Sequence, residues 1–271
     1  MKSQVTFYIV GALVVLIFLI MIFSNSDPAE TLNIGSSLAI RNIHIDAFNV
    51  YAEKCVYDSS IDALYKTAFH GGYNNPATSG IEYINYKNKH VAYWNKGYLD
   101  ISPSYDTIIR ELSSFVTNQT INCIASYDEP SLILDFDGKK ANTEISFFDE
   151  NINIVFKLPV ELKSGNSKNS LSAFSTKIDY NYDKNLLIAK NILKDISIKQ
   201  TKFYDINENC EKIITNKMTK IFITNYVAEA DNNVRILSIM DYEPYFEHGK
   251  QPLVLNLALR NITVTGYCND F

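Results

Sequence analysis

The residues of this chain that could do acid–base chemistry gather in one acidic, aromatic stretch near its C-terminus. Residues 241–247 read Asp-Tyr-Glu-Pro-Tyr-Phe-Glu. Paired carboxyl groups flanked by aromatic rings suit the hydrolysis of a glycosidic bond. The same composition is typical of a solvated connection between strands, which is the interpretation we favour for Asp241, Glu243 and Glu247. An extracytoplasmic hydrolase stays an alternative, and no catalytic residue is assigned.

Motifs for metals and cofactors are weaker still. The four histidines are scattered, and Asp135-Phe136-Asp137-Gly138 begins like a calcium loop but lacks the later ligands and the closing glutamate. We therefore expect a hairpin turn there. Nucleophile-elbow, zinc-protease, phosphate-loop and dinucleotide motifs are all missing from the sequence. The sequence predicts no metal, no cofactor and no enzymatic activity.

The cysteines carry the clearest chemical signal. Cys55, Cys123, Cys210 and Cys268 form no CxxC pair, and no histidine stands at a metal-ligand interval from them. On the oxidising side of a membrane, the default for four such cysteines is two disulfides. Three connectivities are possible and four buried thiols are the alternative. We favour Cys55–Cys123 together with Cys210–Cys268.

An uncharged apolar stretch at the N-terminus predicts on which side of a membrane the cysteines lie. Val5–Phe23 is nineteen residues long, close to the roughly 20 helical residues that cross a hydrocarbon core. A signal peptide is the alternative, although its apolar region usually runs about 7 to 15 residues. Lys2 precedes the span, whereas Asp27 and Glu30 follow it. The positive-inside bias then predicts a single-pass membrane protein with a cytoplasmic N-terminus and an extracellular C-terminal domain.

The composition of the outward part indicates a packed domain. Apolar residues make up 46% of the chain, which argues against disorder. The net charge is −5 and there is no basic stripe, so nucleic acid is not an expected partner. Two acceptor triplets, at Asn118 and Asn261, are glycosylation candidates on an outward surface.

The predicted fold class is α+β, with a transmembrane helix followed by an antiparallel sheet packed with about three helices. We divide the chain into a stub and span (1–23), a linker (24–41), a helix–helix–meander module (42–180) and a helix with C-terminal strands (181–271). The last two modules can be continuous. Apolar spacing predicts helices over His44–Phe69 and Asp183–Ile198. Another helix is expected to begin after an N-cap at Ser102, with Pro103 in its first turn.

Alternating apolar residues predict the strands. The clearest is Ile152–Leu162, in which Pro159 indicates an edge strand or a bulge. Residues 81–94 predict a short hairpin, and Val234–Met240 is expected to pair with Leu253–Val264. Cys55 and Cys123 fall on the apolar stripes of the first two helices, so packing those stripes together would bring their sulfurs close.

Short motifs along most of the chain resemble a family of uncharacterised single-pass archaeal proteins that is common in small-genomed symbiotic lineages. The residues that carry this resemblance are Lys2, Ser3, Gln4, Val5, Thr6, Tyr51, Cys55, Gly71, Gly72, Tyr73, Pro103, Ser104, Cys123, Leu158, Pro159, Val160, Ala258, Arg260 and Asn261. The resemblance implies the membrane topology and the first disulfide. Cys210 and Cys268 are additional to the pattern, and the family implies no activity.

The favoured function is a non-enzymatic surface module that the N-terminal helix anchors in the bilayer. Its expected partner is an envelope protein, a glycan or another cell, and its oligomeric state is left open. Aromatic residues dominate binding hot spots, so the predicted contacts are exposed loops around Tyr73, Tyr242, Tyr245 and Phe246.

The alternative from another class is a pilin-like filament subunit. Lys2-Ser3-Gln4-Val5-Thr6 resembles the processed leader of archaeal pilins. Phe7 stands where such leaders carry an acidic residue, and Asp27-Pro28 is expected to interrupt a continuous helical stalk.

Overall fold

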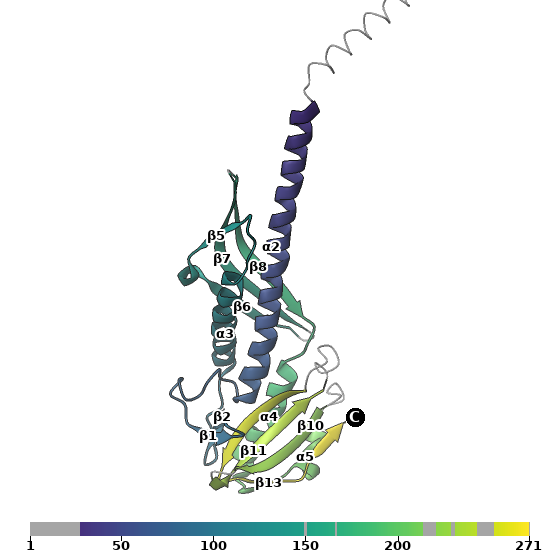
Figure 1. The fold of residues 1–271 in the computed structure, drawn as a ribbon. Coiled ribbons are helices and arrows are strands. Elements are labelled where there is room, and N and C mark those ends of the chain that lie inside the picture. The colour runs from purple at the N-terminus through teal and green to yellow at the C-terminus, as the bar shows by residue number, and fades with distance from the viewer. Residues whose placement is uncertain are drawn as a thin grey trace, which may run out of the picture. The chain divides into compact units, whose positions relative to one another are not determined.

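The structure is a computed structural model that describes residues 28–148, 151–165, 167–213, 221–228, 231–242 and 252–270 (Figure 1). The chain divides into two compact units, residues 1–48 and 49–271, and helix α2 (Pro28–Phe69) begins in the first and ends in the second. None of the helices described is both long enough and apolar enough to cross a membrane. The predicted span, Val5–Phe23, lies outside the described residues.

Helix α2 begins earlier than the sequence indicates. We predicted a linker over residues 24–41 and a helix from His44, yet residues 28–41 are helical too. A proline fits the first turn of a helix because the N–H that it lacks would have no intrahelical partner there. Pro28 therefore marks a helix start, while residues 24–27 lie outside the described part of the chain.

Residues 49–271 form an α+β unit whose two four-stranded sheets are antiparallel, as predicted, whereas a short pair of strands, residues 203–205 with 263–265, is parallel. The remaining helices are α3 (Tyr105–Ala125), α4 (Asp183–Lys199), α5 (Ile206–Ile213) and the 3-10 turn η1 (Gly138–Lys140). The strands are β1 (Tyr83–Tyr86), β2 (Lys89–Ala92), β3 (Asn95–Lys96), β4 (Leu99–Asp100), β5 (Ile133–Phe136), β6 (Asn142–Phe147), β7 (Ile152–Ser164), β8 (Ser167–Ile178), β9 (Phe203–Asp205), β10 (Ile221–Ala228), β11 (Asp231–Asp241), β12 (Leu253–Arg260), β13 (Thr263–Thr265) and β14 (Cys268–Asp270). With α2, the described residues hold four α-helices against about three predicted; α5 lies in a stretch whose pattern is ambiguous.

Two glycines end α2 at Phe69, as predicted. Gly71 and Gly72 have φ angles of +74° and +92°, and the N–H of Gly72 donates to the carbonyl of Thr67 at 2.8 Å. A Cβ on Gly72 would lie 2.6 Å from Pro103. Glycine is required here both for the left-handed backbone and for the close approach of the two segments.

Helix α3 starts two residues later than predicted. Its N-cap is Ser104, whose hydroxyl accepts the N–H of Thr107 at 3.2 Å, and not Ser102. The backbone N–H of Ser102 instead donates to the Asp100 carboxylate at 2.8 Å. Both serines satisfy the preference for a polar cap before a helix, so the sequence pattern does not separate them.

Strand β7 is the centre of the first sheet. It pairs with β5 and β6 along one edge and with β8 along the other, and all the pairings are antiparallel. The register against β8 shifts between Lys157 and Val160, at Pro159. The register shift confirms the predicted bulge. Because β7 has partners on both sides, the edge-strand alternative is wrong.

The apolar side chains of α2, α3 and this sheet share one core. A small cavity of about 10 Å³ is bordered by all of these elements, through Ser60, Ala63, Leu64, Leu112, Val116, Ile145, Ile152, Ile154 and Ile178. The amphipathic stripes that define the helices in sequence therefore face the sheet. The Cys55–Cys123 disulfide joins the two helices with a Cα–Cα distance of 5.8 Å, which confirms the predicted pair.

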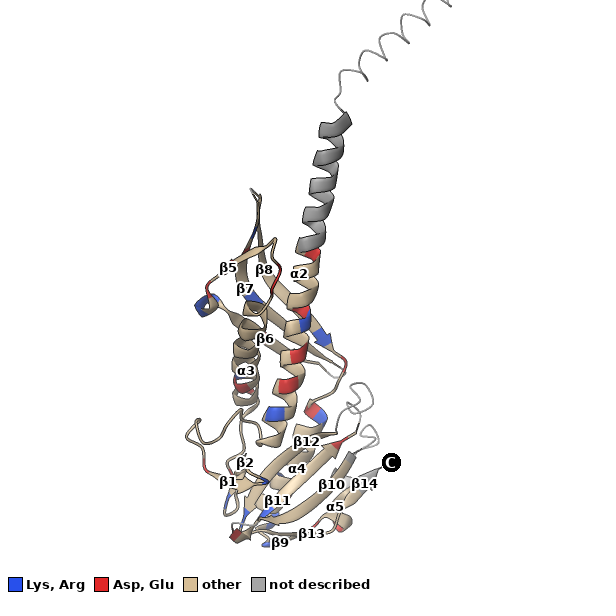
Figure 2. Ribbon diagram, viewed as in Figure 1, with Lys and Arg blue, Asp and Glu red and all other residues tan. Residues whose placement is uncertain are grey.

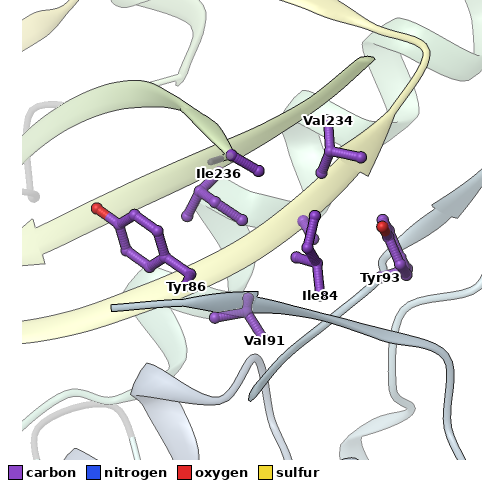
Figure 3. Close-up of a cluster of buried hydrophobic side chains, with 8 residues drawn as sticks. Ile84, Tyr86, Val91, Tyr93, Val234 and Ile236 are labelled. Atoms are coloured by element: carbon purple, nitrogen blue, oxygen red, sulfur yellow. The ribbon is translucent and has the colours of Figure 1, made fainter. Parts of the chain in front are cut away.

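The second sheet has the strand order β12-β11-β10-β14 and contains the predicted pairing of β11 with β12. The β1–β2 hairpin packs against it. Figure 3 shows Ile84, Tyr86 and Val91 of the hairpin meeting Val234 and Ile236 of β11. The predicted pair Cys210–Cys268 is also confirmed, with a Cα–Cα distance of 5.6 Å, and joins α5 to β14.

Candidate ligand-binding groove

Several connections converge at one end of the second sheet and line an open groove of about 400 Å³. We term it the amide groove; its lining residues are Gly97, Tyr98, Lys202, Asn232, Asn233, Arg235, Asn261, Ile262 and Thr263. They belong to the β3–β4 turn, the residue before β9, the start of β11 and the β12–β13 connection. In Figure 2, basic (blue) and acidic (red) positions both lie at this end of the sheet, near β9 and β11.

A buried asparagine fixes one wall of the amide groove. Asn95 is 4% exposed, and its Nδ2 donates to the carbonyls of Gly97 at 2.7 Å and Arg260 at 3.0 Å. Its Oδ1 accepts the N–H of Arg260 at 2.8 Å. One side chain therefore fastens the β3–β4 turn to the end of β12, because leaving these buried groups unpaired would cost stability.

Backbone hydrogen bonds fix the other walls. The N–H of Asn261 donates to the carbonyl of Asn233 at 2.8 Å, and the N–H of Thr263 donates to that of Lys202 at 2.7 Å. Asn261 has a φ of +59°, a left-handed conformation that asparagine tolerates better than most residues. The groove is thus built from turns that are tied to one another before any ligand arrives.

Two cationic side chains, Arg235 and Lys202, line the amide groove. Arg235 is half-buried and its Nη1 donates to the carbonyl of Asn232 at 3.3 Å, while Lys202 is exposed. None of the lining residues is Asp, Glu, His or Cys. The carboxylate of neighbouring Asp231 accepts the N–H of Asn233 at 2.8 Å and so caps its own turn. The groove offers positive charge and amide groups, but no carboxylate, imidazole or thiol for proton transfer.

A second open pocket, of about 450 Å³, lies beside the ends of α2 and β2. Both of its phenylalanine rings are already covered by cations: the Nζ of Lys66 lies 4.6 Å from the Phe115 centroid, and that of Lys89 lies 4.5 Å from the Phe69 centroid. Such pairs stabilise the surface they cover. Burial lowers the pKa of His70, which also lines this pocket. The pocket is better explained as packed surface than as a preformed ring platform.

The main buried charge cluster lies where α4 begins and β11 ends. Lys184 and Asp241 are 7% and 0% exposed, and their Nζ and Oδ2 atoms lie 2.9 Å apart. The hydroxyl of Tyr180 donates to the same Oδ2 at 2.7 Å, and Nδ2 of Asn185 donates to that hydroxyl at 2.7 Å. The cluster ties α4 to the sheet, and the burial of Asp241 leaves a substrate no access to its carboxylate.

This position overturns the expectation for Asp241. We placed it with Glu243 and Glu247 in a solvated loop, whereas it is the last residue of β11 and is fully buried. A lysine from a distant helix supplies the counter-charge, which the local composition does not reveal. Glu243 and Glu247 lie outside the described residues.

The predicted contact tyrosines do not form an exposed surface in the described part of the chain. Tyr73 is 6% exposed, since the tight turn at Gly72 against Pro103 brings this segment inside. Tyr242 is half-buried beside Asp241. Tyr245 and Phe246 lie outside the described residues, so their role stays a prediction.

The calcium-like segment has a structural explanation. Asp135 pairs with Lys163 at 2.9 Å, and Asp137 caps η1 by accepting the N–H of Lys139 at 3.0 Å. The turn joins β5 to β6, which lie along the same edge of β7 and do not form the hairpin we expected. In the described residues, no group of His, Cys, Asp and Glu could hold a metal ion.

The two glycosylation triplets differ in accessibility. Asn118 is exposed on α3, but its partner Thr120 is 0% exposed within the helix. Asn261 and its partner Thr263 are both exposed at a turn. Glycosylation at either asparagine stays a prediction, and Asn261 has the better access.

The amide groove was not predicted, because its residues come from four separate segments between Gly97 and Thr263. The one local signal is the Asn232-Asn233 pair, which is typical of a turn. Comparisons with protein families, curated proteins and solved structures find no match for this chain. The resemblance to single-pass archaeal proteins therefore stays a prediction.

Proposed function

We propose that this protein is a non-enzymatic binding protein, tethered to the membrane by Val5–Phe23, that holds a ligand of the cell envelope in the amide groove. The observation that carries the proposal is the construction of that groove, in which Asn95 and two backbone hydrogen bonds join its walls. A groove formed before binding loses less conformational entropy on binding than a mobile loop does. Its volume of about 400 Å³ also lies in the range of small-ligand sites.

The disulfides support the extracytoplasmic part of the proposal. All four cysteines are paired, and no free cysteine is left. Disulfides of this kind persist outside the reducing cytosol. A membrane-impermeant amine reagent should therefore label the lysines of the domain in intact cells. Labelling that appears only after lysis would contradict the proposed location.

Crosslinking in native membranes tests the binding function. A photoreactive residue at Tyr98, inside the groove, should capture an envelope component that mass spectrometry can identify. The matched control is the same photoreactive residue at Tyr267, which is 61% exposed and does not line the groove. Equal capture from both positions would mean that the groove is not the binding site.

A pilin-like filament subunit is the second candidate. The observation that favours it is the helical conformation of residues 28–41, where we expected a linker. The intact mass of the native protein separates the two candidates, since a filament subunit requires removal of the leader. A native protein that keeps Met1 or Lys2 would exclude the pilin-like candidate.

A further inference from the structure

We infer that the amide groove binds an anionic saccharide, with the carboxylate of the sugar held by Arg235 and Lys202 and its hydroxyls held by the surrounding amides. The inference rests on the proposed binding function and specifies its ligand. It depends on charge, hydrogen-bonding capacity and pre-organisation, which are separate properties of the groove.

The charge of the groove selects for an anion. Its two ionisable side chains other than tyrosine are both cationic, within a chain whose net charge is −5. Among the described residues, neither Lys202 nor Arg235 has a carboxylate partner within ion-pair distance. Arg235 has five N–H donors and its Nη1 bonds to one backbone carbonyl at 3.3 Å, so donors remain for a carboxylate.

The amides select for a hydroxylated ligand over a bare anion. Asn232, Asn233 and Asn261 line the groove, and the side chain of an asparagine carries both an N–H₂ donor and a carbonyl acceptor. Sugar hydroxyls both donate and accept hydrogen bonds, so these side chains can pair with them in either sense. A site for a bare anion would need donors alone. Tyr98 adds one aromatic ring to the lining.

Pre-organisation makes the groove more than a group of surface side chains. Half-buried Arg235 lies on β11, which pairs with β12, and the buried side chain of Asn95 holds the facing β3–β4 turn. The positive group is therefore presented from a sheet and not from a free loop. A charge held in place in this way pairs with a ligand at a smaller entropic cost.

The test uses the full chain in phosphatidylcholine nanodiscs, made in a host that does not glycosylate proteins so that Asn261 stays free. Titration calorimetry compares digalacturonic acid with its methyl ester, which keeps the sugar skeleton and removes the charge. We expect the acid to bind at least about tenfold more tightly than the ester, because only the acid forms charge-assisted hydrogen bonds. Equal affinities would overturn the inference.

Variants locate the binding. Arg235→Gln should weaken digalacturonate binding by about tenfold to a hundredfold, whereas Arg110→Gln makes the same charge change on α3, outside the groove, and should leave it unchanged. If Arg235→Gln fails to fold, Lys202→Gln at an exposed position serves instead. Equal weakening by the Arg110 and groove variants would show a non-specific charge effect and overturn the inference.

A competition arm separates a saccharide site from a simple anion site. Inorganic sulfate should displace digalacturonate only at a large excess, since it carries no O–H donor for the acceptor groups of the amides. Displacement at equal concentration would overturn the saccharide assignment. The proposed function is tested separately by lysine labelling and crosslinking from Tyr98. If digalacturonate fails to bind while Tyr98 still captures an envelope component, only the ligand class is wrong.

Discussion

Two regions of this molecule hold cationic side chains in opposite ways. At the start of α4, Lys184 is buried with Asp241 2.9 Å from its ammonium group. In the amide groove, Arg235 and Lys202 have no acidic residue in the lining. The position of the counter-charge distinguishes the two regions. The cation paired inside the protein holds the fold, whereas the cations of the groove are, in our proposal, the ones that pair with an anionic ligand.

The physical reason is the cost of desolvation. A charge moved out of water loses several kcal/mol of solvation, which a close opposite charge and hydrogen bonds must offset. The Lys184–Asp241 pair meets this requirement through the Tyr180 hydroxyl as well as through the ammonium group. Arg235 is half-buried and Lys202 is exposed, so water offsets much of that cost in the groove.

Breaking the buried pair should give the largest effect. Asp241→Asn keeps the shape of the side chain but removes the negative charge that faces Lys184. We expect the free energy of unfolding to fall by about 3 to 5 kcal/mol, the usual cost of leaving one buried charge without its partner. Denaturant unfolding of the full chain in nanodiscs measures it.

The control for this prediction replaces both charges. Lys184→Met with Asp241→Leu leaves neither charge buried, so it should be less destabilising than Asp241→Asn alone. If the double variant lost as much stability as Lys184→Met and Asp241→Leu lose together when each is made alone, the two charges would not be a coupled pair.

Removing the side chain of Asn95, which joins two walls of the groove, should have the next largest effect. The substitution should lower both stability and ligand affinity. Asn95→Ala leaves the N–H of Arg260 and the carbonyls of Gly97 and Arg260 without their side-chain partner. We expect a loss of about 1 to 3 kcal/mol, together with weaker digalacturonate binding because the β3–β4 turn is released. Unfolding and calorimetry measure the two effects.

Asn95→Asp refines this prediction. The carboxylate keeps an acceptor for the N–H of Arg260 but cannot donate to the two carbonyls. It also adds a negative charge beside the groove. The affinity for digalacturonate should therefore fall further than in Asn95→Ala. An equal loss of affinity in the two variants would show that the added charge at position 95 does not affect ligand binding.

The contrast also explains what the sequence could predict. Elements with strong local periodicity were found within a few residues, such as α4, predicted to start at Asp183 and observed there. The first disulfide followed from two helical stripes. Asp241 was misassigned because its partner Lys184 lies on another element. The amide groove escaped for the same reason, since no single segment of the chain carries its pattern.

His70 lies between these two cases, because it is a titratable group that is buried like Lys184 but has no oppositely charged partner among the described residues. It is 9% exposed, its Nδ1–H donates to the carbonyl of His90 at 2.6 Å, and burial lowers its pKa below 6.5. As the pH falls below about 6.5, the unfolded chain takes up this proton first, so folding becomes less favourable. Stability should therefore be full above about pH 6.5 and should decline toward lower pH.

A substitution that keeps the hydrogen bond isolates this titration. The amide Nδ2 of His70→Asn can replace the Nδ1 donor but takes up no proton in this range. The difference in stability between about pH 7.5 and about pH 5 should be smaller in the variant than in the natural chain. An identical pH dependence in the two proteins would remove His70 as its source.

The smallest expected effect on stability belongs to the groove cations. Arg235→Gln removes a charge whose one hydrogen bond within the described residues is a long contact to a backbone carbonyl, at 3.3 Å. We expect the free energy of unfolding to change by no more than about 0.5 kcal/mol, as is usual for surface substitutions. A loss as large as that of Asp241→Asn would mean that Arg235 holds the fold. The contrast between the two regions would then disappear, because Arg235 and Lys184 would both stabilise the fold.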